Sequence, residues 1–85
     1  MSDFNDFIDL IYTTRDKDVL EDFLVGVTTP KERQEIVQRV EIVKRLVKGE
    51  SQQSIATNLG VGVATVTRGS RELIKGRFKV LRKNS

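Results

Sequence analysis

The sequence predicts an all-α fold: one small helical domain that contains a helix-turn-helix unit and pairs with a second copy of itself. Apolar residues recur at helical spacing through most of the 85 residues, and capping residues and glycines separate these stretches. Cysteine and histidine are absent, so no disulfide or Cys/His metal site braces the chain. A chain this short buries only about 60% of its unfolded surface, which favours a homodimer. A monomer with a compact core is the alternative.

Residues 1–27 are predicted to form two amphipathic helices. In "DFNDFIDLIY" the apolar residues follow the helical period with aspartates between them, and "TTRDKD" interrupts the pattern before it resumes. Three of the four phenylalanines lie here: Phe4, Phe7 and Phe23. These helices therefore carry the bulkiest apolar surface, which is expected to form core and dimer contacts. A core within one chain would produce the same pattern.

Residues 29–49 are predicted to form a long central helix. Thr29 is suited to the N-cap, Pro30 to the first helical position, and Glu32 to the reciprocal position of a capping box. Valine, isoleucine and leucine then follow the helical period as far as Gly49, which ends the helix after two cationic residues.

Residues 51–75 are predicted to form the helix-turn-helix unit, and residues 76–85 a basic tail. Ser51 can cap the first short helix, and Gly60 supplies a left-handed turn before the second helix. Two helices that cross at such a turn need a small residue at their contact, here Ala56. The inward apolar positions are Ile55, Leu59, Val61 and Val66.

The charge is unevenly distributed. Residues 1–30 contain two basic and seven acidic residues, whereas residues 31–85 contain thirteen basic and five acidic ones. Such an asymmetry favours nucleic-acid contact by the basic part. No apolar run approaches the roughly 18 residues of a membrane helix, and the acidic start differs from a signal peptide, so a cytoplasmic location is expected. Without histidine, cysteine, paired carboxylates or a phosphate-binding loop, an enzyme is not expected.

The stretch "GVGVATVTRGS" contains mostly small side chains and then Arg68. A recognition helix enters the major groove by its N-terminal residues, which must be small enough for a close approach. Val63 and Ala64 can contact thymine methyl groups, and Thr67 can hydrogen-bond to a base edge. The alternative is a surface that packs against another helix.

The central and C-terminal parts of the sequence resemble a known family. "TPKER", "RVEIVKRLVKGE" and "GVGVATVTRGS", within about Thr29 to Leu73, are similar to the Trp repressor family. The resemblance implies an intertwined homodimer whose two reading heads meet successive major grooves about 34 Å apart on an operator, a docking geometry that this family itself exemplifies. The residues expected at the DNA are Gln52, Gln53, Ala56, Gly62, Val63, Ala64, Thr67 and Arg71.

The resemblance also implies L-tryptophan as corepressor, with Arg39 and Arg68 on the two faces of the indole ring. Thr29 matches a pocket residue that offers its carbonyl, and Gly69 matches a glycine close to the ligand. No metal is implied. The alternative to this ligand role is that Arg39 forms an ion pair with Glu35 or lies near Glu41, and that Arg68 contacts a DNA phosphate.

The sequence departs from the family at three places. Glu72 stands where the family has a serine that helps to hold the ligand's ammonium group. Gln53 and Ala56 replace basic residues of the reading head. The Gly49–Gln52 connection is one residue shorter, and the chain ends soon after Phe78, where the family has another helix.

The function expected is that of a sequence-specific DNA-binding transcriptional repressor that L-tryptophan activates. The alternatives are a constitutive DNA-binding dimer, a dimer with a different small-molecule effector, and a helical protein-interaction module. The partners expected are double-stranded operator DNA, a second copy of the chain and an amino-acid effector, with no membrane.

Overall fold

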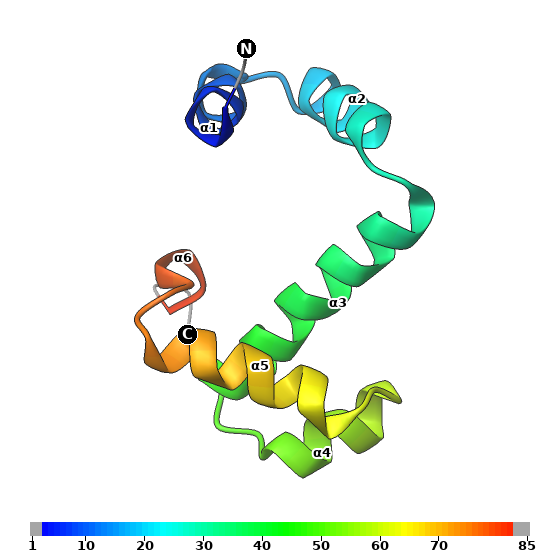
Figure 1. Ribbon diagram of the computed structural model, residues 1–85, viewed down its shortest axis with the longest axis vertical. Coiled ribbons are helices and arrows are strands. Elements are labelled where there is room, and N and C mark those ends of the chain that lie inside the picture. The colour runs from blue at the N-terminus through cyan, green and yellow to red at the C-terminus, as the bar shows by residue number, and fades with distance from the viewer. Residues whose placement is uncertain (1–2, 83–85) are drawn as a thin grey trace. The chain divides into compact units, whose positions relative to one another are not determined.

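The computed structural model describes residues 3–82, and every regular element in that range is a helix (Figure 1). The helices are α1 (Phe4–Thr13), α2 (Lys17–Val27), α3 (Pro30–Val47), α4 (Gln52–Leu59), α5 (Val63–Ile74) and α6 (Lys79–Arg82). The chain forms two compact units, Met1–Gln34 and Glu35–Ser85. The all-helical prediction is confirmed for this range.

In the first unit, aspartates begin both N-terminal helices. The Asp3 carboxylate accepts a hydrogen bond from the Asp6 amide at 3.0 Å, and the Asp6 carboxylate accepts one from the Asp3 amide at 3.3 Å. The Asp16 carboxylate accepts from two amides at the start of α2. Acceptors at these positions satisfy amides that lack partners within the helix. Both helices therefore begin and end close to where the apolar period predicts.

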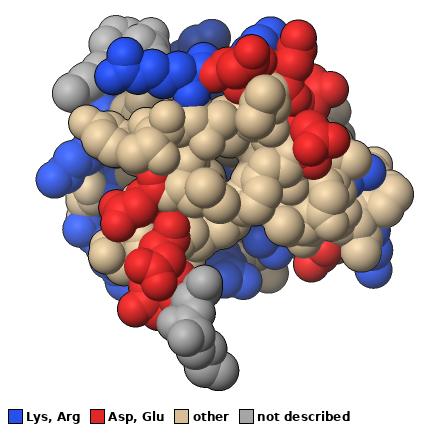
Figure 2. Space-filling view, turned by 90° about the horizontal axis from the view of Figure 1, so that it is seen from above, with Lys and Arg blue, Asp and Glu red and all other residues tan. Residues whose placement is uncertain are grey.

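Aromatic packing joins α1 to α2. The ring centroids of Phe7 and Phe23 are 5.8 Å apart, and the Phe4 ring stacks on Phe7 at 6.0 Å. No residue of either helix is buried, and Phe4 and Tyr12 are 74% and 85% exposed. In the space-filling view, uncharged side chains form a broad area with acidic groups beside it (Figure 2). The bulky apolar surface of these helices is thus open in the single chain.

The start of α3 has the capping box that the sequence predicts. The Thr29 amide donates to Glu32 Oε1 at 2.8 Å, and the Glu32 amide donates to Thr29 Oγ1 at 3.1 Å. The hydrogen bond from the Thr29 backbone amide, followed by that from the Thr29 side chain, lowers the pKa of the Glu32 carboxyl. The Arg33 guanidinium also donates to the Thr28 carbonyl at 2.8 Å, which fixes the chain at its entry to α3.

In the second unit, a small core joins α3, α4 and α5. Ile42, Ile55 and Val66 form one buried cluster, and Val43 is also buried. Leu46, Ala56, Leu59 and Val61 are partly buried against that cluster. All four predicted inward positions of the helix-turn-helix unit therefore lie in or against this core, and α5 crosses α4 in Figure 1.

Ser51 and Gly60 mark the two ends of α4. Ser51 Oγ accepts from the Ser54 amide at 3.1 Å. Gly60 has φ +66°, a left-handed conformation that costs little without a Cβ atom. The Val61 amide then donates to the Ala56 carbonyl at 3.0 Å, which closes the turn. The predicted cap and turn are both confirmed.

A polar network around Glu50 connects the end of α3 with α4. Glu50 Oε2 accepts from Ser54 Oγ at 2.9 Å and from Asn58 Nδ2 at 3.0 Å. Glu50 Oε1 lies 3.5 Å from an Arg45 nitrogen, and Arg45 also pairs with Glu41 at 2.9 Å. The hydrogen bond from Ser54 is the largest cause that lowers the pKa of Glu50, while partial burial opposes it.

The chain turns back after α5. Gly76 has φ +96°, and Phe78 has φ +65°, which is uncommon for a bulky residue. Arg82 donates to the Leu73 and Arg77 carbonyls, so α6 is held against the end of α5. Part of the predicted basic tail is thus helical, and residues 83–85 lie outside the described range. None of the helices in residues 3–82 has the length and apolar character that a membrane span requires.

Candidate functional site

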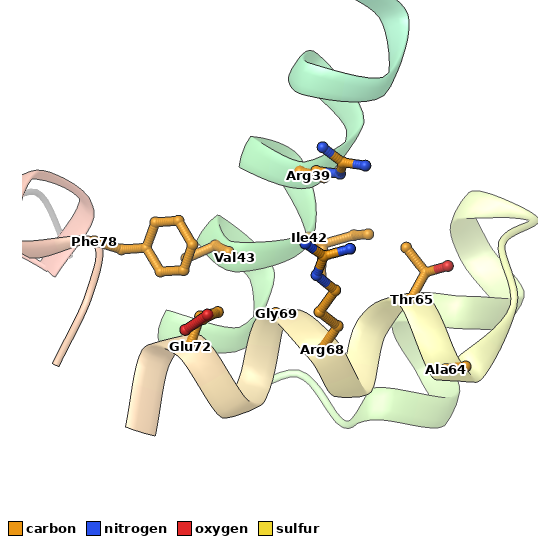
Figure 3. A pocket seen from close by; sticks show the side chains of 9 residues that line it. All are labelled: Arg39, Ile42, Val43, Ala64, Thr65, Arg68, Gly69, Glu72 and Phe78. Atoms are coloured by element: carbon orange, nitrogen blue, oxygen red, sulfur yellow. The ribbon is translucent and has the colours of Figure 1, made fainter. Parts of the chain in front are cut away.

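A cavity of about 370 Å³ lies between α3 and α5 in the second unit. Its size falls within the range of small-molecule sites, roughly 300–1,000 Å³. Arg68 extends from α5 toward α3, and Glu72 and Phe78 lie at the opposite end from Ala64 and Thr65 (Figure 3). The lining residues are Arg39, Ile42, Val43, Ala64, Thr65, Arg68, Gly69, Glu72 and Phe78.

Arg39 and Arg68 both line this cavity, one from each helix. Within residues 3–82, neither guanidinium makes a hydrogen bond or an ion pair. The Glu41 carboxylate, near which the sequence could place Arg39, pairs instead with Arg45. Two cationic groups without protein acceptors are thus available to a ligand in the cavity.

Gly69 allows α5 to approach α3 closely. A Cβ atom at this position would lie 3.4 Å from Ile42 Cγ2 and 3.7 Å from Val43 Cγ2. The first distance is at the tight edge of ordinary packing, so a side chain would press against α3 beside the cavity. Both apolar neighbours also line the cavity, which gives it an apolar wall between the charged groups.

Glu72 and Phe78 form one end of the cavity. Glu72 Oε2 is shielded from solvent and accepts no hydrogen bond within the described range. The Lys75 ammonium lies 3.7 Å from this oxygen, too far for a good hydrogen bond. The Phe78 ring points toward Val43 in Figure 3. The site therefore combines two cations, one anion and a wall of apolar and aromatic groups.

An adjoining face of α5 carries the small residues that the sequence predicts for DNA contact. Val63 is 50% exposed, and Ala64 at the first turn is also exposed. Thr67 is half-buried. Its hydroxyl donates to Gln52 Oε1 at 2.8 Å and also lies 3.0 Å from the Val63 carbonyl oxygen, a second acceptor. This surface at the first turn of α5 is therefore open, and Thr67 is hydrogen-bonded to the first residue of α4.

The structure brings together four of the five predicted ligand residues: Arg39, Arg68, Gly69 and Glu72. Thr29 belongs to the other unit, where it caps α3, and its ligand contact stays a prediction. Of the predicted DNA residues, Gln53, Gly62 and Arg71 are exposed, whereas Ala56 packs partly against the core. Ala64 lines the cavity and also belongs to the open surface at the first turn of α5.

Four lining residues were absent from the sequence-based site predictions: Ile42, Val43, Thr65 and Phe78. Thr65 follows Ala64 on α5, and its helical position places it one turn before Arg68 and Gly69, so the period contains a usable signal. Phe78 reaches the cavity through the turn after α5 and its own left-handed backbone. No local pattern predicts that path, because it depends on Gly76 and on contacts of the following helix.

Comparison with known proteins identifies the family. The sequence pattern of the family described as Trp repressor protein matches residues 2–81. The chain belongs to the Trp repressor family. The Trp operon repressor homolog of Vibrio vulnificus strain YJ016 is 44% identical over 73 residues, which are 85% of this chain and 72% of that protein. The homolog of Vibrio atlanticus strain LGP32 is 49% identical over 67 residues, 78% of this chain and 68% of that protein.

This match confirms the resemblance and extends it from the central and C-terminal helices to α1 and α2. The Trp repressor family is a family of regulators rather than enzymes. Within residues 3–82, no three acidic side chains are grouped so that they could hold a metal ion.

Proposed function

We propose that the protein is a sequence-specific DNA-binding transcriptional repressor, located in the cytoplasm, that L-tryptophan activates as corepressor. One observation carries the proposal: the cavity and the exposed small residues lie on adjoining faces of one helix, α5, and Ala64 belongs to both. A ligand between α3 and α5 contacts the same helix that reads the DNA. Occupancy of the cavity and the orientation of the reading face are thereby coupled.

The cavity fits an aromatic amino acid by size and by chemistry. Arg39 and Arg68 offer planar cations without protein acceptors, and such groups bind the faces of aromatic rings with about 0.5–2 kcal/mol each. The same guanidinium groups can bind a carboxylate, and Glu72 can bind an ammonium group. Gly69 leaves room beside the apolar wall. When bound, the ligand supplies contacts to both α3 and α5.

Regulation then follows from differential affinity. A ligand shifts the orientation of the reading head only if it binds one orientation more tightly than another. The core that joins α5 to α3 is small, so contacts across the cavity add to the few that hold the head. Tryptophan therefore favours the orientation in which both arginines reach it.

For the DNA interface we propose the exposed first turn of α5 and the start of α4. Val63 and Ala64 are small enough for close approach to the major groove. Gln52, Gln53 and Arg71 supply hydrogen-bond donors for bases and phosphates, with Gly62 and Thr67 beside them. Ala56 contributes by its packing behind this surface.

We propose a homodimer as the active form. Apolar residues of α1 and α2 are exposed in the first unit, and Ile36, Val37 and Val40 of α3 are exposed in the second. Monomeric proteins rarely leave so much apolar surface in water, and a second copy of the same chain offers a matching surface. Sedimentation equilibrium at micromolar concentration should give twice the chain mass of 9.7 kDa.

Two titrations test the proposal. Calorimetry with L-tryptophan should give saturable binding, and fluorescence anisotropy with a near-palindromic operator should show tighter DNA binding when tryptophan is present. About six phosphate contacts would weaken DNA binding on the order of 1,000-fold between low and moderate salt. No heat with millimolar tryptophan would remove the corepressor, and a flat salt dependence would indicate a protein-interaction module instead.

Glu72 supports a second candidate: a DNA-binding dimer with a different effector or with none. A carboxylate at this position changes the charge balance of the cavity and is costly to bury without a partner. Operator binding that is indifferent to tryptophan would favour a constitutive protein. A melting-temperature screen across the amino acids would identify another effector.

A further inference from the structure

Glu50 lies in the short connection between α3 and α4, and its carboxylate contacts both helices. Its Oε1 lies 3.5 Å from an Arg45 nitrogen of α3. Its Oε2 accepts hydrogen bonds from Ser54 Oγ at 2.9 Å and from Asn58 Nδ2 at 3.0 Å. Ser54 and Asn58 are four residues apart, so they lie on one face of α4 in successive turns. One carboxylate therefore bridges the end of α3 and two turns of α4.

This bridge matters because α4 has little buried surface. Of its residues, all of which lie in the described range, Ile55 alone is buried, while Ala56 and Leu59 pack partly against the core. A polar network in which each group has a partner restricts the elements that it joins. The Glu50 side chain is only 26% exposed, so water screens its contacts less than those of a fully exposed pair. The orientation of α4 relative to α3 therefore depends on Glu50.

The start of α4 is also joined to α5. Gln52 Oε1 accepts a hydrogen bond from the Thr67 hydroxyl at 2.8 Å. Both residues belong to the proposed DNA interface, as does Gln53 beside them. Polar contacts thus run from Arg45 of α3 through Glu50 to α4, and from α4 to α5. A shift of α4 would displace both glutamines and would weaken the hydrogen bond to Thr67.

We infer that Glu50 is a positioning residue for DNA recognition, because its bridge between Arg45 and α4 holds the interface residues of α4 in place. The inference rests on the proposed DNA-binding function and adds a residue outside the predicted DNA surface. Its expected effect has the opposite sign to that of charge alone. Neutralising a carboxylate in a DNA-binding unit removes repulsion from the phosphates and raises DNA affinity, whereas loss of the bridge lowers it.

Glu50→Gln is the first test. Glutamine has one acceptor oxygen and no charge, so it cannot serve both Arg45 and α4. We expect operator affinity to fall roughly 2- to 30-fold, the range for residues that act on a site through other residues. Affinity for an unrelated duplex of the same length should not fall. The slope of the salt dependence should also stay the same, because no phosphate contact is lost.

Fluorescence anisotropy with L-tryptophan present measures both DNA affinities, at a temperature well below the melting temperature of each variant. Circular dichroism shows whether the variant is folded. Tryptophan affinity, measured by calorimetry, separates positioning of α4 from a general loss of structure. It should not change, because Glu50 does not line the effector cavity.

Glu41→Gln is a matched control for the charge. Glu41 pairs with the same arginine, Arg45, at 2.9 Å, but this ion pair lies within α3. Its neutralisation should leave operator affinity unchanged. An equal loss in Glu41→Gln and Glu50→Gln would show that the charge near Arg45 matters and that the bridge to α4 does not.

Ser54→Ala and Asn58→Ala break the bridge from the side of α4 and leave the charge of Glu50 in place. Each should lower operator affinity, and neither loss should add fully to that of Glu50→Gln, because the groups act as one unit. These two variants also test the inference if Glu50→Gln does not fold.

Unchanged or higher operator affinity in Glu50→Gln would overturn the role of Glu50 while the DNA-binding function stands. An equal loss on the operator and on the unrelated duplex, or full additivity with Ser54→Ala, would overturn it as well. If the wild type binds no operator, the proposed function and this inference both fail.

Discussion

Thr67 Oγ1 lies 2.8 Å from Gln52 Oε1, so the reading helix α5 is joined by a side-chain hydrogen bond to the first residue of α4. The two residues are fifteen positions apart in sequence and belong to the predicted DNA surface. Thr67 also lies 3.0 Å from the Val63 carbonyl. Because a hydroxyl has one proton, these two acceptors share it in the free protein.

Thr67→Ala should cost about 1–3 kcal/mol of discrimination at one base pair of the operator. The hydroxyl contacts a base edge directly or holds the Gln52 amide in position to do so. Fluorescence anisotropy with operators changed at single base pairs measures the effect. Thr13→Ala, which removes an exposed threonine hydroxyl from α1, is the control and should not alter base preference.

A double-mutant cycle distinguishes the two ways in which Thr67 can act. If Thr67 positions Gln52, the losses from Thr67→Ala and Gln52→Ala will not add, because each removes the same unit. Additive losses would mean that the hydrogen bond between them has no role in recognition. An equal loss on all operators would show that Thr67 does not read a base.

Arg39→Ala should weaken tryptophan binding by roughly 2- to 30-fold, which corresponds to about 0.5–2 kcal/mol for a cation over an aromatic face. Arg39 has no intrachain partner in the described range, so the helical content should stay unchanged. Lys44→Ala removes an exposed cation of the same helix and is the control for charge. Calorimetry and circular dichroism measure both quantities. A loss of helix with unchanged tryptophan affinity would contradict this assignment.

Glu50→Gln should lower the melting temperature at about pH 7 and have little effect in acid. The hydrogen bonds from Ser54 and Asn58 and the charge of Arg45 hold the pKa of Glu50 below its ordinary 4.5. A carboxyl whose pKa is lower in the folded state stabilises the fold at pH values above its ordinary pKa. This stabilisation is lost as the pH falls through the folded-state pKa. The melting temperatures of the two proteins should therefore converge as the pH falls below the ordinary pKa of 4.5 and through the lower folded-state pKa. A constant difference at all pH values would exclude the charge of Glu50 as the cause.

Gly60→Ala should destabilise the protein by about 1–2 kcal/mol, because alanine must adopt φ +66° at that turn. No atom lies within 4 Å of the added Cβ, so the cost comes from the backbone alone. Gly62→Ala is a matched control: its φ is −68°, and its Cβ also meets open space. We expect that substitution to be neutral or to stabilise by up to about 1 kcal/mol. Equal effects in urea unfolding would show that the turn does not depend on the left-handed residue.

Local sequence signals predicted the boundaries of the helices well. Thr29 with Glu32, Ser51 and Gly60 each act within three or four residues, so their roles can be read from a short window. The buried residues Ile55 and Val66 were also predictable, because two helices that cross at a turn need apolar residues at their contact.

Four of the nine lining residues of the cavity were predicted as ligand residues from the family resemblance, and physical patterning alone would have missed them. Arg39 and Arg68 are 29 positions apart and have equally simple explanations as solvent-exposed charges. Their shared cavity depends on how closely α5 approaches α3, which Gly69 permits. Phe78 was missed because its place depends on two left-handed residues after α5. The Gln52–Thr67 hydrogen bond likewise depends on the crossing of two helices.

The fully buried side chains of the described range are few, and Val66 alone anchors α5 among them. Because α5 has only one fully buried side chain, we expect its amide protons to exchange through local openings. A few additional contacts then have a large effect on the orientation of α5. With so small an interior, the few contacts that the proposed amino-acid effector adds across the cavity would be enough to set the orientation of α5.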